Sequence, residues 1–188
     1  MAKTPVQDRS RDRVARMVVA FAELLDEVGY DQATTTAVAQ RSGSAVGSVY
    51  QFFRNRDELA EALRDRLAFI LVDKTVERME KRESTNKDAA DKVTLSECFA
   101  DLHRAMEDMH RNQAGATHVP VRAPWVAQEL APLFKPYCAH PDEDIYSYVL
   151  VAVASSAACV KAALADPAHG MDILGLCQWS LEELGRDV

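Results

Sequence analysis

The segment from Ser42 to Leu59 holds the residues whose types and spacing best suit contact with another molecule. Small, hydroxyl and amide side chains lie there around Gly47, with Tyr50 beside them and Arg56 further on. Hydroxyl, amide and guanidinium groups form hydrogen bonds with phosphate oxygens and with base edges. Glycine inside a helix costs about 1 kcal/mol relative to alanine, but it lets another molecule approach the backbone. This chemistry suits a helix that lies in a DNA groove.

Catalytic and metal-binding motifs are not recognisable in the sequence. A nucleophile elbow, a phosphate-binding glycine-rich loop, an H-E-x-x-H motif and paired acids in a plausible cleft are all missing. We expect none of the five histidines to face a carboxylate one helical turn away, and therefore no metal site. The cysteines lack paired spacing and fall near predicted apolar faces, where cysteine acts as a small hydrophobe; a redox sensor is the alternative. They are Cys98, Cys138, Cys159 and Cys177. We expect no enzyme and no cofactor.

Two short helices are predicted to position the segment. Thr34 is expected to cap a first helix that Gly43 ends. A second helix of nine residues follows, with Ala45, Val49 and Phe53 on an inward face. Two short helices joined by a glycine-containing turn form a helix-turn-helix, whose second helix usually reads the major groove. Such pairs also occur in folds that bind no nucleic acid.

Over roughly residues 10 to 65, the chain resembles the DNA-binding domain of the TetR family of bacterial transcriptional regulators. The family pattern is matched in order and spacing by Gly43, Ala45, Val46, Gly47, Ser48, Val49, Tyr50, Phe52, Phe53 and residues 56–59. The chain departs from the pattern at four positions. Ser44 stands where an aliphatic residue is common, and Ala45 where a serine cap is usual, so Ser44 is expected to act as the cap. Arg56 replaces a lysine, and Phe52 replaces a histidine or tyrosine, which puts a polar phosphate contact there in doubt.

The predicted helix faces and the resemblance together define a DNA-binding surface. Val46, Gly47 and Gln51 face outward, with Thr36 beside them, and are expected at base edges. Val46 suits a thymine methyl group and Gln51 suits adenine. Relatives clamp the DNA backbone at the positions of Tyr50 and Arg56, and Ser48 and Thr35 would add hydroxyl contacts to phosphate.

The remaining sequence predicts an all-α protein. At 188 residues, with 48% hydrophobic and 27% charged residues, the chain has an ordinary soluble composition. No run alternates with a period of two, whereas helical patterns span about 8–28, 56–82, 94–112, 125–137, 141–166 and 171–184. Two pairs of residues are capping signals at helix starts: Asn55 with Glu58, and Thr94 with Glu97. We expect a loop over residues 81–92 and irregular structure over residues 113–124. We expect a three-helix DNA-binding domain over 1–56 and a larger helical ligand-binding and dimerisation domain over 57–188.

Charge and hydropathy bear on location and partners. Residues 1–56 hold eight basic and six acidic residues, a net charge of +2, whereas the whole chain has −7. This distribution suits a single nucleic-acid face. Arg9, Arg11 and Arg13 are interpreted as a solvated tail or as a minor-groove arm. The sequence shows no signal peptide, and the apolar segment Val149–Leu164 is too short to cross a membrane, so we expect a cytoplasmic protein without membrane contact.

The resemblance also implies a homodimer and a small-molecule effector. Alanines and serines in 152–163 permit close approach of helices, and with the last helix they would form a dimer bundle; packing within one chain is the alternative. The interface residues are expected to be Ala154, Ala157, Ala158, Leu174, Trp179 and Leu181. An effector pocket is expected near Phe99, His103, Met106, Trp125 and Phe134, although such residues also build ordinary cores.

The function expected is a homodimeric repressor that binds a palindromic operator in double-stranded DNA and is released by a small molecule. An activator is one alternative. Another is a helical enzyme or protein-binding module that keeps the helix-turn-helix only for packing.

Overall fold

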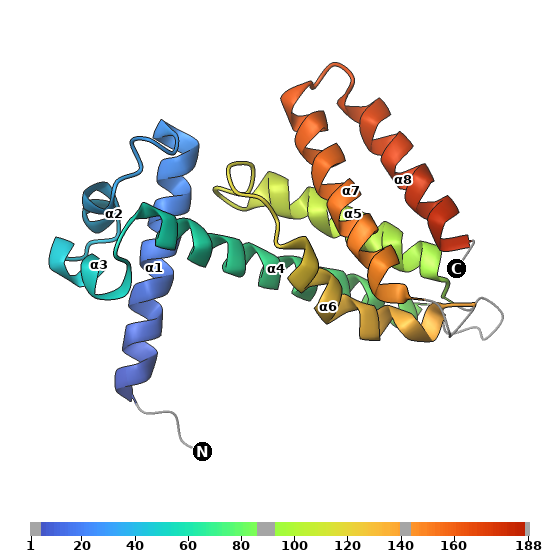
Figure 1. Cartoon of the computed structure of the whole chain (residues 1–188), viewed down its shortest axis with the longest axis horizontal. Coiled ribbons are helices and arrows are strands. Elements are labelled where there is room, and N and C mark those ends of the chain that lie inside the picture. Colours follow the sequence, from blue (N-terminus) through green and yellow to red (C-terminus); the bar gives the residue numbers. More distant parts are fainter. Residues whose placement is uncertain (1–4, 86–92, 140–143, 187–188) are drawn as a thin grey trace. The chain divides into compact units, whose positions relative to one another are not determined.

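A computed structural model describes residues 5–85, 93–139 and 144–186, and for residues 5–8 it describes the backbone alone. Throughout these ranges the regular structure is helical and contains no strand (Figure 1). The prediction of an all-α fold is confirmed.

Two compact units divide the chain. The first contains the described residues up to Arg66 together with Gln113–Pro120, and the second contains Leu67–Asn112 and the described residues from Val121 onward. The division falls inside one long helix. The functional boundary between residues 56 and 57 stays a prediction.

The first unit contains α1 (Pro5–Val28), α2 (Thr35–Arg41), α3 (Val46–Phe52) and the start of α4 (Arg56–Thr85). Apolar side chains on one face of α1, among them Met17, Phe21 and Leu25, are fully buried, as expected for an amphipathic helix. The Thr34 hydroxyl accepts a hydrogen bond from the Ala37 N–H and caps α2, as predicted. Asn55 Oδ1 accepts from the Glu58 N–H at 2.9 Å at the start of α4.

The helix α3 differs from its prediction. It spans seven residues, and its N-cap is Ala45, which provides no side-chain hydrogen bond. Ser44 is not the cap because it belongs to the end of α2, where its N–H donates to the Ala39 carbonyl at 2.9 Å. The left-handed Gly43, with φ +64°, makes this closing turn. Ala45 is exposed rather than inward, while Val49 and Phe53 are buried as expected.

Residues 113–120 are irregular, as predicted. The sequence did not predict that these residues belong to the first unit. The Gly115 N–H donates to Asp26 Oδ2 at 3.0 Å, and Ala116 and Val119 are buried. Gly115 has φ +74°, and a Cβ atom there would lie 2.8 Å from Leu63 Cδ2 and 3.1 Å from Ala22 Cα. Only glycine fits this approach without displacing α1 or α4.

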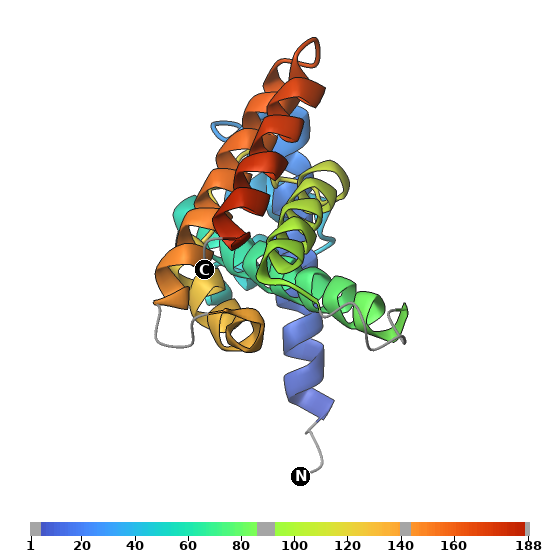
Figure 2. The same cartoon turned by 90° about the vertical axis from the view of Figure 1, so that its right-hand side faces the viewer.

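The second unit contains the rest of α4, then α5 (Leu95–Asn112), α6 (Ala123–Phe134), the 3₁₀ helix η1 (Lys135–Tyr137), α7 (Ile145–Ala165) and α8 (Gly170–Arg186). Figures 1 and 2 show α7 and α8 running alongside each other. Thr94 and Glu97 form the predicted capping box, since the Thr94 N–H donates to Glu97 Oε2 and the Glu97 N–H to Thr94 Oγ1. The predicted start of a helix at 141–143 lies outside the described residues.

The helix α4 is longer than predicted, because residues 81–85 are helical rather than part of a loop. Arg82 explains the extra turn. Its guanidinium group binds the buried Asp101 of α5 through Nε at 2.9 Å and Nη2 at 2.7 Å, and it binds Glu97 through Nη1 at 3.0 Å. These contacts hold the last turns of α4 against α5.

The helix α7 is also longer than the apolar segment that predicted it. It has 21 residues, and by length and composition alone it passes the test for a membrane-spanning helix, as core helices of soluble proteins also do. A third of its most apolar window is buried inside this chain. The predicted apolar segment Val149–Leu164 is only part of this helix, and the fold indicates no membrane protein.

Candidate functional site

The exposed face of α3 carries the residues predicted to read base edges. Val46 is 40% exposed, and Gly47 and Gln51 are exposed beside it. Thr36 is exposed on α2, the helix that packs against α3. The buried Val49 fixes the opposite face of α3. The structure therefore leaves all four predicted base-edge residues accessible.

Gly47 has no structural reason to be glycine among the described residues. Its backbone is not left-handed, and a Cβ atom built on it would have no neighbour within 4 Å. The fold would accept alanine there, and alanine is the better helix former. A molecule that packs onto this turn of α3 from outside would account for the glycine.

Tyr50 and Thr35 form a pair between α3 and α2. The Thr35 hydroxyl donates to the Tyr50 hydroxyl at 3.0 Å. Tyr50 is exposed, whereas Thr35 is buried beneath it. Thr35 therefore orients the Tyr50 hydroxyl in this structure rather than facing solvent, and a phosphate contact by Thr35 itself stays a prediction. Ser48, the other predicted hydroxyl contact, is half-buried on α3.

Arg56 lies at the start of α4 and contacts the turn that follows α1. Its Nη1 donates to the Tyr30 carbonyl at 2.7 Å, and its guanidinium carbon lies 4.1 Å from the centre of the Tyr30 ring. The Tyr30 hydroxyl donates to Asp57, and this hydrogen bond raises the pKa of Tyr30. Arg56 therefore joins α4 to the α1–α2 turn. Sequence reasoning missed Tyr30, because aromatic contacts to arginine have no fixed spacing.

Arg41 fixes α2 to α1. Its guanidinium group binds Glu27 through two hydrogen bonds of 2.8 and 2.5 Å. This contact holds the pKa of Glu27 below its ordinary value. The pair is exposed, so its role is to orient α2 rather than to stabilise the fold strongly.

The residues predicted for an effector pocket are mostly core. Phe99, His103, Met106 and Phe134 are fully or almost fully buried, and the Phe99 and Phe134 rings pack 5.9 Å apart. Trp125 is half-buried, with its ring 4.6 Å from that of Phe69. The second unit does contain a cavity of about 530 Å³ between α7 and α8. Other residues line it: Val151, Ser155, Cys159, Ile173, Leu176, Cys177, Ser180, Leu181 and Leu184.

His103 corrects the expectation about histidines. Its Nε2 lies 3.3 Å from Glu107 Oε1, one turn along α5, without the alignment of a hydrogen bond. Its Nδ1 lies 3.8 Å from Cys177 Sγ. Burial lowers the pKa of His103 and so favours the neutral ring. Within the described residues no cluster of three or more His, Cys, Asp or Glu side chains is arranged to hold a metal.

The residues predicted for the dimer interface fall into two groups. Ala154 and Ala158 are exposed, Ala157 is half-buried, and Trp179 is 59% exposed. Leu174 and Leu181 are instead buried inside the unit, because they lie on the face of α8 that packs on the other helices. The other exposed large apolar residues on these two helices are Tyr146, Val151, Met171 and Leu176.

Residues 18–63 match the family model described as bacterial regulatory proteins, tetR family. A TetR-family transcriptional regulator from Streptomyces coelicolor is 29% identical, with 95% of this chain and 98% of that chain covered and a TM-score of 0.78. No significant match is found among curated proteins.

Two more distant structures share the fold. One, described as the molecular basis for control of antibiotic production by a bacterial hormone, is 19% identical over 91% of this chain and 95% of that chain, with a TM-score of 0.59. A fatty acid degradation regulator from Bacillus halodurans is 16% identical over 95% and 97%, with a TM-score of 0.53. The matched helix-turn-helix, its exposed α3 and the full-length likeness to the Streptomyces regulator lead to one conclusion: residues 18–63 form a DNA-binding domain of the tetR type, and the chain as a whole is similar to a TetR-family transcriptional regulator.

Proposed function

We propose that this regulator is a cytoplasmic homodimeric repressor that binds a palindromic operator and is released by a small molecule. The exposed face of α3 carries the proposal, because it leaves Gly47 open to a partner that the chain itself does not supply. In this proposal, four residues contact base edges: Thr36, Val46, Gly47 and Gln51. The DNA phosphates are contacted or positioned by Ser48, by Tyr50 with Thr35, and by Arg56. The boundary between DNA-binding and regulatory functions lies at residues 56–57.

The surface of α7 and α8 supports dimerisation. Val151, Leu176 and Met171 are more than half exposed, at 52%, 66% and 79%. Apolar side chains on helices of this length favour a partner surface. Two copies related by a twofold axis would place two α3 helices on successive major grooves, about 34–36 Å apart. Two weak half-site contacts then act as one strong contact.

Release by an effector is based on the cavity between α7 and α8, whose lining residues Val151 and Leu176 also belong to the surface proposed for dimerisation. A ligand shifts a conformational equilibrium only if it binds one state more tightly than the other. Occupation of the second unit would therefore favour a dimer whose α3 helices no longer match the operator. The chemical class of this effector is left open.

Selection of duplexes from a random pool tests the proposal. Bound sequences should converge on two inverted half-sites whose centres lie about one helical turn apart. Failure to enrich any sequence, at a salt concentration where random duplexes are also not bound, would refute DNA binding. A reporter gene placed behind the selected operator separates repression from activation.

The Gln51→Ala variant then tests the assignment of base reading. It should relax the preference at one base position in each half-site, at a cost of about 1–3 kcal/mol per pairing. Affinity for random duplexes should be unchanged, because phosphate contacts supply that affinity. An equal loss on operator and random DNA would show that Gln51 does not read a base. Thr117→Ala is the control, since Thr117 lies in the 113–120 segment rather than on α2 or α3.

A further inference from the structure

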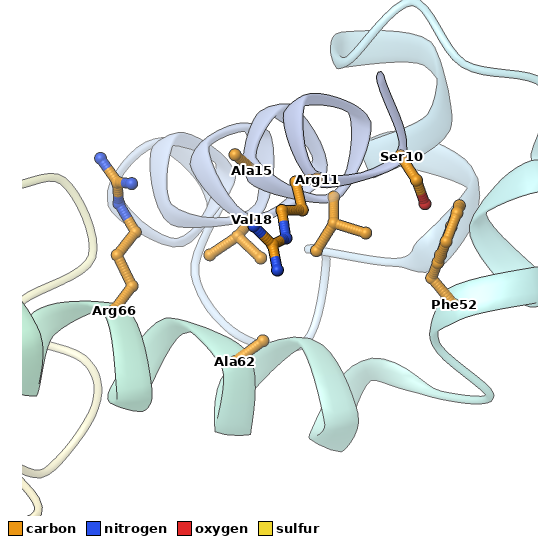
Figure 3. A pocket seen from close by; sticks show the side chains of 8 residues that line it. Ser10, Arg11, Ala15, Val18, Phe52, Ala62 and Arg66 are labelled. Atoms are coloured by element: carbon orange, nitrogen blue, oxygen red, sulfur yellow. The ribbon is translucent and has the colours of Figure 1, made fainter. Parts of the chain in front are cut away.

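The first unit contains a groove of about 570 Å³ between α1 and α4 (Figure 3). The residues that form its apolar walls include Val14, Val18 and Ala62. Phe52 lies at one end of the groove (Figure 3). Ser10, Arg11, Ala15 and Arg66 complete the lining. The volume falls within the range of small-molecule sites, about 300–1,000 Å³. None of the residues proposed to contact DNA on α2, α3 and α4 belongs to this lining, whereas Arg11 does belong to it and is also part of the minor-groove arm considered above.

Two arginines give the groove its charge. The Arg11 side chain reaches from α1 over the middle of the groove, and Arg66 rises from α4 at the end away from Phe52 (Figure 3). Four other arginines of this unit, Arg41, Arg54, Arg56 and Arg64, lie within 4 Å of a carboxylate. Among the described residues, no carboxylate lies within that distance of Arg11 or Arg66. These two guanidinium groups are therefore available to an outside anion.

The arrangement combines an apolar cleft with unpaired guanidinium groups. A guanidinium group binds a carboxylate or sulfonate through two parallel hydrogen bonds. The aliphatic walls and the Phe52 ring complement an apolar body of a few carbon units, which gains about 0.8 kcal/mol for each buried methylene. We propose that this groove binds a small amphipathic anion, such as an aliphatic carboxylate, with its charged group on Arg11 or Arg66 and its chain against Val14, Val18 and Phe52.

The site is distinct from an effector site in the second unit. All its lining residues belong to the first unit. Phe52 is the last residue of α3 and follows Gln51 directly. A ligand that packs against Phe52 therefore contacts the helix proposed to read DNA. Control of α3 in this way rests on the proposed function, whereas the binding of the anion does not.

Titration of the isotope-labelled full-length protein with octanoate, in the absence of DNA, tests the site. Saturable changes in amide resonances should centre on residues that line the groove, including Val14, Phe52 and Ala62. The uncharged analogue 1-octanol should bind at least tenfold more weakly. Resonance changes confined to α7 and α8, or equal affinity for octanoate and octanol, would overturn the proposal.

Four variants sharpen the test. Arg11→Gln should weaken octanoate binding about tenfold, and Ala62→Trp should abolish it by filling the groove. Arg13→Gln is the matched control, because Arg13 is exposed on α1 but does not line the groove. Circular dichroism establishes that each variant is folded, and Arg11→Gln together with Arg66→Gln decides the outcome if Ala62→Trp does not fold. Unchanged octanoate affinity in Arg11→Gln and Arg66→Gln would overturn the proposal.

The DNA backbone is the competing partner for these arginines. If octanoate does not bind while Arg11→Gln weakens binding to all duplexes, the groove belongs to the DNA interface and the proposal fails. If octanoate binds in the groove but the chain binds no duplex, the site stands and the proposed repressor function fails.

Discussion

Arg56 makes contacts in the structure that its position in the family pattern does not predict. The family pattern puts a phosphate contact there, while the structure joins the guanidinium group to the Tyr30 carbonyl and to the Tyr30 ring. A guanidinium group carries five N–H donors, so a structural contact leaves donors for phosphate. Tyr30 and Arg56 are 26 positions apart, and only the contact between the α1–α2 turn and the start of α4 reveals the pair.

Gly47 gives the sharpest prediction for one residue. The Gly47→Ala variant should stabilise the free protein by about 0.5–1 kcal/mol, because alanine is the better helix former and its methyl group meets no neighbour. The same methyl group should weaken operator binding if DNA approaches this turn closely. Chemical denaturation and a gel-shift titration measure the two effects. A variant that is more stable and binds the operator normally would remove Gly47 from the interface.

The buried histidines predict a pH dependence. Burial lowers the pKa of His103 and of His110 in the folded protein. The unfolded chain, with a histidine pKa of about 6.5, therefore binds protons more readily, and stability falls as pH drops below that value. Urea midpoints at pH 7.5 and pH 5.5 should show this loss, and His103→Gln should reduce it. An equal loss in His103→Gln and the wild type would contradict the prediction.

At the scale of elements, local signals were predictable and contacts between distant segments were not. The caps of α2 and α5 follow from Thr34 and from Thr94 with Glu97, because capping depends on neighbours within three residues. The prediction of Ser44 as a cap was wrong because the same residue also completes the end of α2. Nor does any local pattern place residues 113–120 against Asp26, 89 positions from Gly115. Leu174 and Leu181 share an apolar pattern with Trp179, and only packing distinguishes the buried face from the exposed one.

The Arg82→Ala variant tests how much the contacts at the end of α4 stabilise the fold. Removal of its side chain in Arg82→Ala leaves Asp101 buried without its partner at 2.7 Å. Because Arg82 is partly exposed, we expect a loss of about 1–3 kcal/mol in the free energy of unfolding, below the value for a fully buried pair. Arg186→Ala is the matched control, since its partner Glu183 lies on the same exposed stretch of α8 and the change should cost less than about 0.5 kcal/mol. Equal urea midpoints for the two variants would show that the Arg82 contacts are not stabilising.

At the scale of the whole molecule, the apolar character of α7 supports the proposed dimer. The helix is apolar enough to pass a membrane test, yet only a third of its most apolar window is buried in one chain. The exposed positions include Val151, Ala154 and Ala158, two of them small. Small side chains let a second backbone approach closely, and the neighbouring α8 adds Leu176 and Trp179. A second copy would cover these residues and would also set the spacing of the two α3 helices.

Ala158→Trp tests that arrangement directly. Ala158 is exposed in the single chain, so a tryptophan there leaves the core of the second unit intact. In a twofold interface the same substitution overpacks the contact, at a cost of about 1–3 kcal/mol for each site. Light scattering should therefore report a monomer with unchanged helical content, and affinity for the palindromic operator should fall because the two half-sites are no longer bound together. Ala139→Trp, at an exposed position outside both helices, should remain dimeric. A dimeric Ala158→Trp protein with normal operator affinity would place the interface elsewhere.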